Sequence, residues 1–546
     1  MKQLSMQLGD MEHQPPKSYK GIYAMHKYWS KKPPDLVSNY ISRFSSPGDV
    51  VMDPFCGSGV TIIESVRMRR KGLGFDINPI AVFLTEMGLE RVDVEELQRS
   101  YDELKARAKP IINKLYKTTC PKCAKDDALA THYIWEDGQI SEVWVSCNGC
   151  RSSKVTKTPD KRDLQTIDSL DIPAERYLQN CLIENSRINA KSGMKISDLF
   201  TKRALHALTF LLEEIHQIDD VIVRNAMKLC FSASLPQTSR MVFVIRRRGK
   251  TAGDSVNPKA EVGSWVIGYW VPSEHFEINV WRCFENRFRR ILRGKKEIAD
   301  LIPIRSTAHT SFEQFVTESN GYYVGLGNAS KLPVETESVD YVFTDPPHGN
   351  RIPYLELSLM WNSWLGHDNI DWENEIVVSQ AKERRKDNCD YRIRLSAAIR
   401  EIWRVLKPDK CMSIAFNSLD DKTWLSLLNS CTQTGFKLTE IRPMEYSARS
   451  VVQDNRRNAL KTDFVLTFRK QTPNVPEELL LHENRKDIRD IIRDYLNGLS
   501  GECVETYEIL NHVLVLQARR GRYIPVKTLL NVLNKEFRYI DFSWQI

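Results

Sequence analysis

Two pairs of cysteines have the spacing of a metal site: Cys120 with Cys123, and Cys147 with Cys150, with 23 residues between the pairs. Each CxxC pair forms a tight turn that presents two thiolates, so the four together predict a tetrahedral structural zinc site. Disulfide bonds are the alternative, and the opening residues argue against them because they contain no export signal. The other eight of the 12 cysteines are scattered, and we expect them to be small buried groups.

A carboxylate, two rigid prolines and an imidazole follow one another at Asp345, Pro346, Pro347 and His348. They come directly after residues 338–343, which predict a short strand. Open α/β sheets place their binding crevices at the carboxyl ends of parallel strands, so the position favours a functional site. A stiff turn is the alternative, since Asp-Pro-Pro followed by Gly-Asn also favours a chain reversal.

A second polar group belongs to a predicted strand-helix-strand unit. The first strand ends in Asp53, the glycines Gly57 and Gly59 lead into an amphipathic helix, and the next strand ends in Asp76. Glycines there let the backbone approach a ligand, and the second carboxylate is placed to accept hydrogen bonds from ribose hydroxyls. The spacing differs from GxGxxG, which argues for a nucleoside ligand without a pyrophosphate.

The composition indicates a globular protein of several domains, with 546 residues, 42% hydrophobic and 27% charged. No run of about 18 apolar residues occurs, so we expect no membrane association and, by default, a cytoplasmic location. The net charge of +8 is concentrated, because residues 240–296 contain 13 Lys and Arg against 5 Asp and Glu. Such a segment suits nucleic acid, although a solvated surface also explains it.

The α/β pattern stops near Arg91 and resumes near Tyr322, and the long insertion between them must contain folded units of its own. We therefore expect an α/β fold whose Rossmann-like sheet is interrupted by a zinc ribbon and a helical recognition region, with a small helical C-terminal module. The expected domains are the first half of the sheet domain (1–92), a helical connector (93–116), the zinc ribbon (117–158), a helical and basic recognition region (159–320), the second half of the sheet domain (321–470) and a helical or winged-helix-like module (471–546).

Five stretches of the chain resemble the S-adenosylmethionine-dependent amino-methyltransferases of DNA, which methylate exocyclic amines of adenine or cytosine. The resemblance is strongest to bacterial and archaeal members with a zinc ribbon inside the catalytic fold, and it covers about residues 20–92 and 199–470. It implies a methyltransferase sheet, S-adenosylmethionine and structural zinc as cofactors, and DNA as partner. The stretches are HKYWSKKP from His26, DPFCGSG from Asp53, the strand ending at Asp76, GNASKLP from Gly327 and TDPPHGN from Thr344.

On the catalytic side, the resemblance implies that Asp345 and the carbonyl of Pro346 accept the two amine hydrogens of the target base. The prolines, including Pro347, would fix these acceptors in place. The family usually has Tyr, Phe or Trp at the position of His348, where the ring stacks on the extruded base, and we expect the imidazole to do the same.

On the cofactor side, the resemblance places Asp53 at the methionine amino group and Asp76 at the ribose. Asn328 stands where the family often has an acid that contacts the adenine amine, and an amide can still accept that hydrogen bond. The implied cofactor residues are His26, Tyr28, Trp29, Lys31, Asp53, Pro54, Phe55, Gly57, Gly59, Asp76 and Asn328.

An enzyme of this kind must flip its target base out of the duplex, so we expect phosphate contacts from the basic insertion. The apolar residues of the predicted helix 281–291 recur at helical spacing and are expected in the core, namely Trp281, Phe284, Phe288 and Ile291. The expected DNA-binding residues are Arg246, Arg247, Arg248, Arg282, Arg287 and Arg290.

Adenine N6 is favoured over cytosine N4 as the target, because aspartate rather than serine or threonine precedes the two prolines. A tRNA guanine-N2 methyltransferase is a second hypothesis, since those enzymes have similar motifs. A catalytically inactive module that binds cofactor and DNA is a third, and His348 keeps it open. Separate restriction or phage-defence proteins are further candidate partners, as expected for a restriction-modification role.

Overall fold

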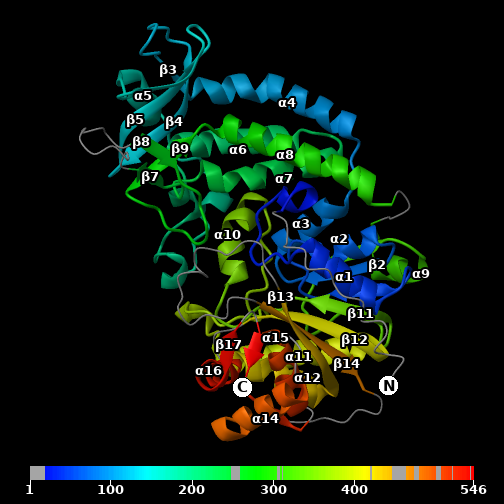
Figure 1. The fold of residues 1–546 in the computed structure, drawn as a ribbon. Coiled ribbons are helices and arrows are strands. Elements are labelled where there is room, and N and C mark those ends of the chain that lie inside the picture. Colours follow the sequence, from blue (N-terminus) through cyan, green and yellow to red (C-terminus); the bar gives the residue numbers. More distant parts are fainter. Residues whose placement is uncertain are drawn as a thin grey trace.

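The computed structural model describes residues 19–247, 259–303, 308–309, 311–417, 421–444, 463–471, 479–499, 504, 506–518, 520–540 and 543–545. The central sheet lies between the inserted region at one end and the C-terminal module at the other (Figure 1). Within these ranges no helix has both the length and the apolar character needed to cross a membrane.

The central sheet has seven strands in the order β10-β2-β1-β11-β12-β14-β13. Neighbouring strands are parallel except for β14, which is antiparallel to β12 and β13. The chain runs outward from β1 through β2 to β10 and then resumes at β11, so the order reverses between β1 and β11. Open α/β sheets bind ligands at such a reversal. The strands are β1 (Val50–Asp53), β2 (Lys71–Asp76), β10 (Tyr322–Leu326), β11 (Val339–Thr344), β12 (Leu406–Phe416), β13 (Phe436–Met444) and β14 (Asp463–Lys470).

Helices cover both faces of this sheet, because alternate side chains of each strand point to opposite faces. Val51 and Tyr341 pack in one core with helix α1, whereas Met52 and Val342 pack in another with α11 and α12. Burial on both faces explains the nearly continuous apolar strands, and the α/β fold class is confirmed. The helices of this domain are α1 (Pro34–Phe44), α2 (Val60–Arg67), α3 (Pro79–Leu89), α9 (Phe312–Thr317), α10 (Tyr354–Trp364), α11 (Asn388–Val405) and α12 (Asp421–Thr434).

The insertion begins with a long helix that lies beside three others above the sheet domain (Figure 1). Helix α6 begins at Lys202, because the Thr201 hydroxyl accepts a hydrogen bond from the Ala204 N–H and caps it. The helices are α4 (Val94–Lys114), α5 (Lys161–Asp168), α6 (Lys202–His216), α7 (Val221–Thr238) and α8 (Val280–Leu301). The short 3-10 helices within the described residues are η1 (Gly21–Ala24), η2 (Arg176–Gln179), η3 (Ser186–Ile188), η4 (Ile196–Leu199) and η5 (Lys382–Arg384).

A five-stranded sheet at the outer end of the insertion includes one strand from much later in the chain, β9, which pairs with β4. The buried Arg203 of α6 holds this sheet against the helices, because its guanidinium lies 3.9 Å from the Tyr133 ring centre and 3.4 Å from the Glu277 carboxylate. The strands are β3 (Lys117–Thr118), β4 (Ala128–Glu136), β5 (Gln139–Cys147), β6 (Ser152–Lys157) and β9 (Glu274–Ile278), and a separate hairpin joins β7 (Val244–Arg247) and β8 (Lys259–Val262).

The C-terminal module consists of three helices and short strands. It docks through α15 on the edge strand β13, where the Asn511 side chain accepts a hydrogen bond from the Ile441 N–H at 2.8 Å. The elements are β15 (Leu480–Leu481), α14 (Arg485–Gly498), α15 (Thr506–Ala518), β16 (Arg522–Tyr523), α16 (Val526–Glu536), β17 (Arg538–Ile540) and β18 (Ser543–Gln545), with the last two strands paired as a hairpin.

Candidate active site

Most of the predicted catalytic and cofactor residues meet in one pocket at the carboxyl ends of β1, β2 and β11. Its volume is about 880 Å³ counted out to the open mouth, within the usual range for a nucleoside-sized ligand. The predicted residues that line it are Tyr28, Trp29, Lys31, Asp53, Pro54, Phe55, Gly57, Asp76, Asn328, Asp345 and Pro347. Four predicted residues lie outside the lining: His26, Gly59, Pro346 and His348.

Asp53 ends β1 and ties it to β11. One of its carboxylate oxygens accepts hydrogen bonds from the Thr344 hydroxyl at 2.6 Å and from the Phe55 N–H at 3.1 Å. Burial raises the pKa of Asp53 to about 7 despite these hydrogen bonds. A cation bound beside this carboxylate would favour its ionised form.

Asp76 ends β2 and organises the glycine turn. Its two oxygens accept hydrogen bonds from the Gly57 N–H at 2.8 Å and the Asn78 N–H at 2.9 Å, and burial raises its pKa to about 6. The position of Gly59 in this turn requires glycine. Its φ is +80°, and a Cβ there would lie 2.7 Å from the Thr85 side chain.

Residues 26–31 form an arm over the pocket, and its members have different tasks. Tyr28 and Trp29 form an aromatic wall. The Lys31 ammonium donates to the carbonyls of Tyr23 at 3.0 Å and His26 at 2.6 Å, and burial lowers its pKa to about 8. His26, the first residue of the arm, does not line the pocket, and burial lowers its pKa to about 3. These two residues stabilise the arm, and the two aromatic rings face the ligand space.

Asp345 is held by a lysine that the motif comparison missed. The Lys32 ammonium lies 2.8 Å from one Asp345 oxygen and 3.4 Å from Asp463, and both Lys32 and Asp463 are almost fully buried. Asp463 also accepts a hydrogen bond from the Asn417 amide at 2.7 Å. The available signal was the lysine directly after the arm, but Lys32 pairs with residues 313 and 431 positions away, and local patterns do not reveal such pairs.

His348 contacts the other oxygen of Asp345, with its Nε2 at 3.0 Å, and the Ala415 carbonyl, at 3.3 Å. Its Nδ1 faces the Arg351 guanidinium at 3.4 Å. Two acceptors at Nε2 and a donor at Nδ1 fit the tautomer with the proton on Nε2. The side chain is only 4% exposed and lies edge-on to Phe416, so its faces are not open for a base to stack on, contrary to the expectation from its position.

Further contacts fix the rest of the pocket. The Tyr391 hydroxyl donates to the Pro347 carbonyl at 2.8 Å and holds the Pro-Pro turn. The Asn328 side-chain oxygen accepts from the backbone and hydroxyl of Ser330, at 2.9 and 2.7 Å, so its amide oxygen is already engaged. Among the lining residues that were not predicted are three that no motif marks: Tyr354, Asn374 and Glu375.

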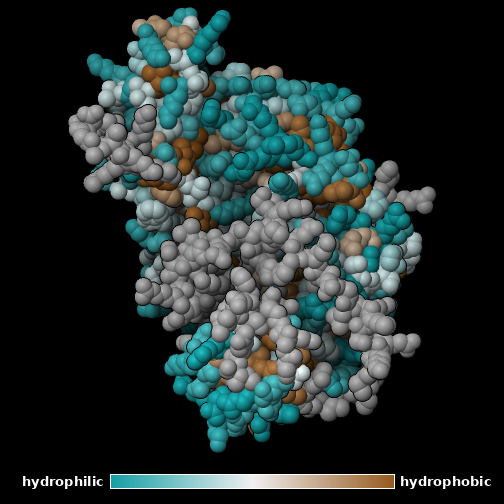
Figure 2. Space-filling model, viewed as in Figure 1, coloured by the Kyte–Doolittle hydropathy of each residue, from teal (hydrophilic) through white to brown (hydrophobic). Residues whose placement is uncertain are grey.

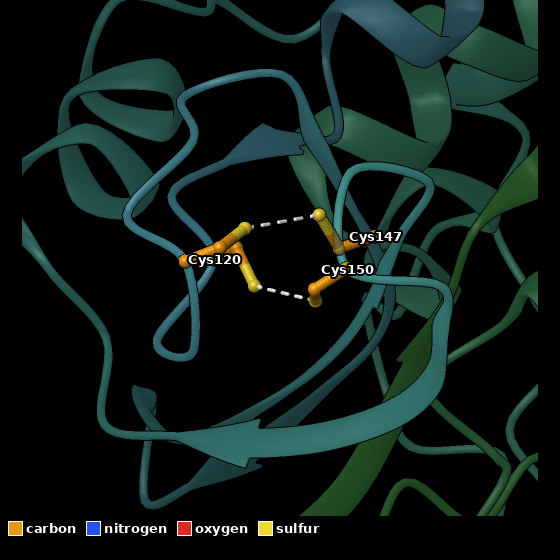
Figure 3. A group of neighbouring side chains, drawn as sticks. Cys120, Cys147 and Cys150 are labelled. Atoms are coloured by element: carbon orange, nitrogen blue, oxygen red, sulfur yellow. Dashed lines mark hydrogen bonds between the residues drawn. The ribbon is translucent and has the colours of Figure 1, made fainter.

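The four predicted zinc ligands converge at the outer end of the insertion (Figure 3). The Sγ atoms of Cys120 and Cys150 are 3.7 Å apart and those of Cys123 and Cys147 are 3.6 Å apart. Zinc–sulfur bonds of about 2.3 Å in a tetrahedron require sulfur separations of about 3.8 Å, so the geometry fits a zinc ion. The set has four thiolates, which leaves no open position for water.

The predicted DNA-binding arginines differ in their surroundings. Arg282 and Arg290 are exposed on α8, and Arg246 is partly exposed on β7, where Glu274 pairs with it at 2.9 Å. Arg287 is mostly buried, and burial lowers its pKa, so it is not on the free face of the helix as expected. Arg247 lies in β7, and Arg248 lies outside the described residues. The expected core positions are confirmed: Trp281, Phe284, Phe288 and Ile291 are buried.

The doubly wound sheet has a Rossmann-like fold, and the pocket at its reversal is large enough for a nucleoside-containing ligand. Residues 8–86 match the family described as DNA methylase. The Type II methyltransferase M.MjaII of Methanocaldococcus jannaschii is 29% identical over 433 residues, which cover 73% of this chain and 72% of that protein. These matches support an amino-methyltransferase of this family.

Two further relatives match over shorter stretches. The Type II methyltransferase M.HpaI of Haemophilus parainfluenzae is 32% identical over 105 residues, 19% of this chain and 29% of that protein. The DNA adenine methyltransferase YhdJ of Escherichia coli is 39% identical over 75 residues, 13% of this chain and 24% of that protein. A solved S-adenosylmethionine-dependent methyltransferase of Methanosarcina mazei, 14% identical, covers 30% of this chain and 80% of that chain, but its TM-score of 0.16 is too low to support an argument.

Proposed function

We propose that this protein transfers a methyl group from S-adenosylmethionine to the exocyclic amine of a flipped-out DNA base, with adenine N6 favoured over cytosine N4. The observation that carries the proposal is that Asp345 opens into the same pocket as Asp53, Asp76 and the glycine turn. A methyl donor held by the latter three would therefore share one enclosed space with the carboxylate that accepts amine hydrogens.

The pocket fits S-adenosylmethionine by the chemistry of its lining. The Asp53 carboxylate would bind the amino group, Asp76 the ribose hydroxyls, and Tyr28 and Trp29 would cover the ligand. Asp53 in particular is a buried carboxylate with a raised pKa, which a cationic group beside it would return to the ionised state. When bound, the cofactor supplies an electrophilic methyl group.

The chain's own contribution is to hold the amine and to stabilise charge on it. The Asp345 carboxylate accepts one amine hydrogen and the Pro346 carbonyl the other, so the nitrogen lone pair faces the methyl donor. Lys32 orients the Asp345 carboxylate, and Asp463 pairs with Lys32 within the same buried group. The proton released after transfer passes from the nitrogen to solvent.

The choice of adenine depends on the aspartate before the two prolines, because serine or threonine at this position is typical of cytosine N4 enzymes. The relative YhdJ is described as an adenine methyltransferase, which supports the same choice. A tRNA guanine-N2 methyltransferase and an inactive cofactor-binding and DNA-binding module are the alternatives. A role beside separate restriction or phage-defence proteins and a cytoplasmic location also stay predictions.

Sequencing of genomic DNA after expression in a host without adenine or cytosine-N4 methylation tests the proposal directly. We expect N6-methyladenine in one sequence context, and none with Asp345→Ala. Methylated cytosine would show that cytosine N4 is the target in place of adenine N6. Methylated guanine in tRNA without DNA modification would favour the tRNA guanine-N2 methyltransferase. Cofactor binding without methyl transfer to either nucleic acid would favour the inactive module.

We also propose that Cys120, Cys123, Cys147 and Cys150 bind one structural zinc ion. Purified protein should contain about one equivalent of zinc, and Cys147→Ser should lose the metal with local unfolding of the outer sheet. Cys181→Ser is the matched control, because Cys181 is an exposed cysteine elsewhere in the insertion. Metal-free protein with unchanged thermal stability would rule the zinc site out.

Phosphate contacts by Arg246, Arg282 and Arg290 are the corresponding proposal for DNA, and they rest on exposure and charge. Their replacement by glutamine should weaken binding to all sequences alike and reduce its dependence on salt.

A further inference from the structure

A loop of the insertion exposes large apolar side chains in an unusual way. The loop comprises residues 263–271, and in it Val266 is 61% exposed, Ile267 43% and Trp270 52%. Two other aromatic residues of the loop, Trp265 and Tyr269, are buried. Figure 2 shows brown apolar patches among the teal surface around β8 and β9, next to this loop in the chain. We call residues 265–270 the wedge loop, and Val266 and Ile267 its tip.

The buried residues of the wedge loop fix its backbone. The Tyr269 hydroxyl donates to the carbonyls of Glu356 and Leu357, at 2.8 and 2.9 Å, and the Trp265 indole donates to the Gly268 carbonyl at 2.7 Å. Gly268 has φ +82°, and a Cβ there would lie 2.6 Å from the Ile188 carbonyl oxygen. A loop anchored in this way holds its exposed tip in place without help from a ligand.

These anchors attach the wedge loop to the elements of the active site. Trp265 lies 6.2 Å, ring to ring, from Trp29, which lines the pocket. The Lys27 ammonium, in the arm over the pocket, donates to the carbonyls of Trp265 and Val266. Glu356 and Leu357 belong to the first turn of α10, whose first residue Tyr354 also lines the pocket. The tip therefore projects from the rim of the catalytic centre.

The surface beside the tip is positively charged. A hollow of about 570 Å³ behind it is lined by Lys27, Arg287 and Trp265, and no Asp or Glu is among the described residues that line it. Among the described residues, no carboxylate lies within ion-pair distance of Lys27 or Arg287. An exposed lysine next to exposed apolar side chains fits a duplex, which presents phosphates outside and stacked bases inside.

We propose that Val266 and Ile267 enter the duplex next to the target base and fill the space that the extruded base leaves, while the exposed Lys27 contacts a neighbouring phosphate. The proposal rests on the DNA methyltransferase function proposed above. Extruding a base costs stacking and pairing energy, and an apolar side chain in the gap recovers part of it. An unrelated protein partner would need an apolar surface here, but it would not need the rim of the catalytic centre.

The test compares two double variants. Val266→Ser with Ile267→Ser removes the tip, and Val221→Ser with Ile222→Ser is the matched control, because those neighbours on α7 are 55% and 39% exposed. Once the methylated sequence is known, each protein is assayed on a short duplex that contains it. In a second duplex the position opposite the target base is abasic, so the target is already unpaired.

We expect the tip variant to methylate the paired duplex about tenfold more slowly than wild type and to approach wild type on the abasic duplex, with cofactor affinity unchanged. The control variant should match wild type on both. Equal rates for tip variant and wild type on the paired duplex would overturn the wedge and favour a protein partner, and an equal loss on both duplexes would also overturn it. If wild type itself methylates no DNA, the proposed function fails, and the wedge fails with it.

Discussion

The carboxylates on the two sides of the pocket have different partners. On the cofactor side, Asp53 and Asp76 accept hydrogen bonds only from neutral groups, and among the described residues no cation lies within ion-pair distance of either. Burial accordingly raises their pKa values, to about 7 and about 6. On the catalytic side, Asp345 already has the Lys32 ammonium at 2.8 Å and the His348 ring at 3.0 Å.

This difference indicates which partner each side lacks. On the cofactor side, the Asp53 and Asp76 carboxylates can still accept hydrogen bonds from a ligand with an ammonium group and hydroxyls. Binding of such a ligand would balance their negative charge. The catalytic side is already balanced inside the protein, so its carboxylate is oriented before a base arrives. Preorganised charge of this kind stabilises a transition state without the cost of reorientation.

Replacing Asp345 by alanine should lower methyl transfer on the order of a thousandfold, because the group that stabilises charge on the amine is removed. Cofactor affinity should stay within about twofold, since the cofactor side is separate. Lys32 keeps Asp463 as a partner, so the fold should persist. Radiolabelled transfer to unmethylated genomic DNA measures the first effect and calorimetry the second. Asp368→Ala, an exposed aspartate after α10, is the control. A large loss of cofactor binding would mean that the two sides are not separate.

Replacing Asp76 by alanine should weaken S-adenosylmethionine binding by roughly ten- to a hundredfold, since hydrogen bonds to a charged acceptor are worth about 1.5 to 3 kcal/mol. The Asp76→Asn variant keeps the size of the side chain and one acceptor, so we expect an intermediate loss. Calorimetry at pH 7.5 measures both. Affinity equal to that of wild type in both variants would show that the ribose binds elsewhere.

The Asp53 carboxylate should make cofactor binding depend on pH. Its pKa is raised to about 7 by burial, and only the ionised form attracts an ammonium group, so affinity should increase as the pH rises. Between pH 6 and pH 7 the ionised fraction grows about fivefold, and affinity should follow. The pH series should end at pH 7, because an α-amino group loses its own proton near pH 7.7 to 8.0, roughly, and would then no longer be an ammonium. Asp53→Asn should abolish the dependence and bind weakly throughout. A flat profile for wild type would show that Asp53 does not meet the amino group.

The sequence predicted the sheet, the pocket and its main carboxylates, because these depend on local patterns. Strand, glycine turn and acid recur at short spacing around Asp53 and Asp76, and Asp345 directly follows a strand. The pairing of Lys32 with Asp345 could not be predicted in this way, since it depends on how the arm crosses the sheet. Similarly, helical spacing correctly predicted the buried face of α8 but put Arg287 on the free face, because that side chain packs under the wedge loop.

His348 shows the same limit, since its place in the motif predicted stacking and its contacts indicate a different task. In the structure its Nε2 lies 3.0 Å from Asp345 and 3.3 Å from the Ala415 carbonyl, and Phe416 packs against the ring. We infer that it helps to orient the carboxylate through this close contact, and we expect its loss to cost about as much as one weak hydrogen bond, roughly 0.5 to 1.5 kcal/mol. His348→Ala should therefore slow methyl transfer roughly three- to tenfold, with cofactor affinity unchanged.

Two substitutions at His348 separate orientation from stacking. The amide of His348→Gln can donate to Asp345 from a similar position but cannot stack well, whereas His348→Tyr can stack but has to fit a larger ring beside Phe416. We expect the glutamine variant to keep most of the transfer rate and the tyrosine variant to lose about as much as alanine, on the order of three- to tenfold. The assay is radiolabelled transfer to genomic DNA, with Asp345→Ala added to each variant as the inactive background. The opposite ranking, with tyrosine active and glutamine impaired, would mean that the imidazole leaves its buried position and stacks on the extruded base during the reaction.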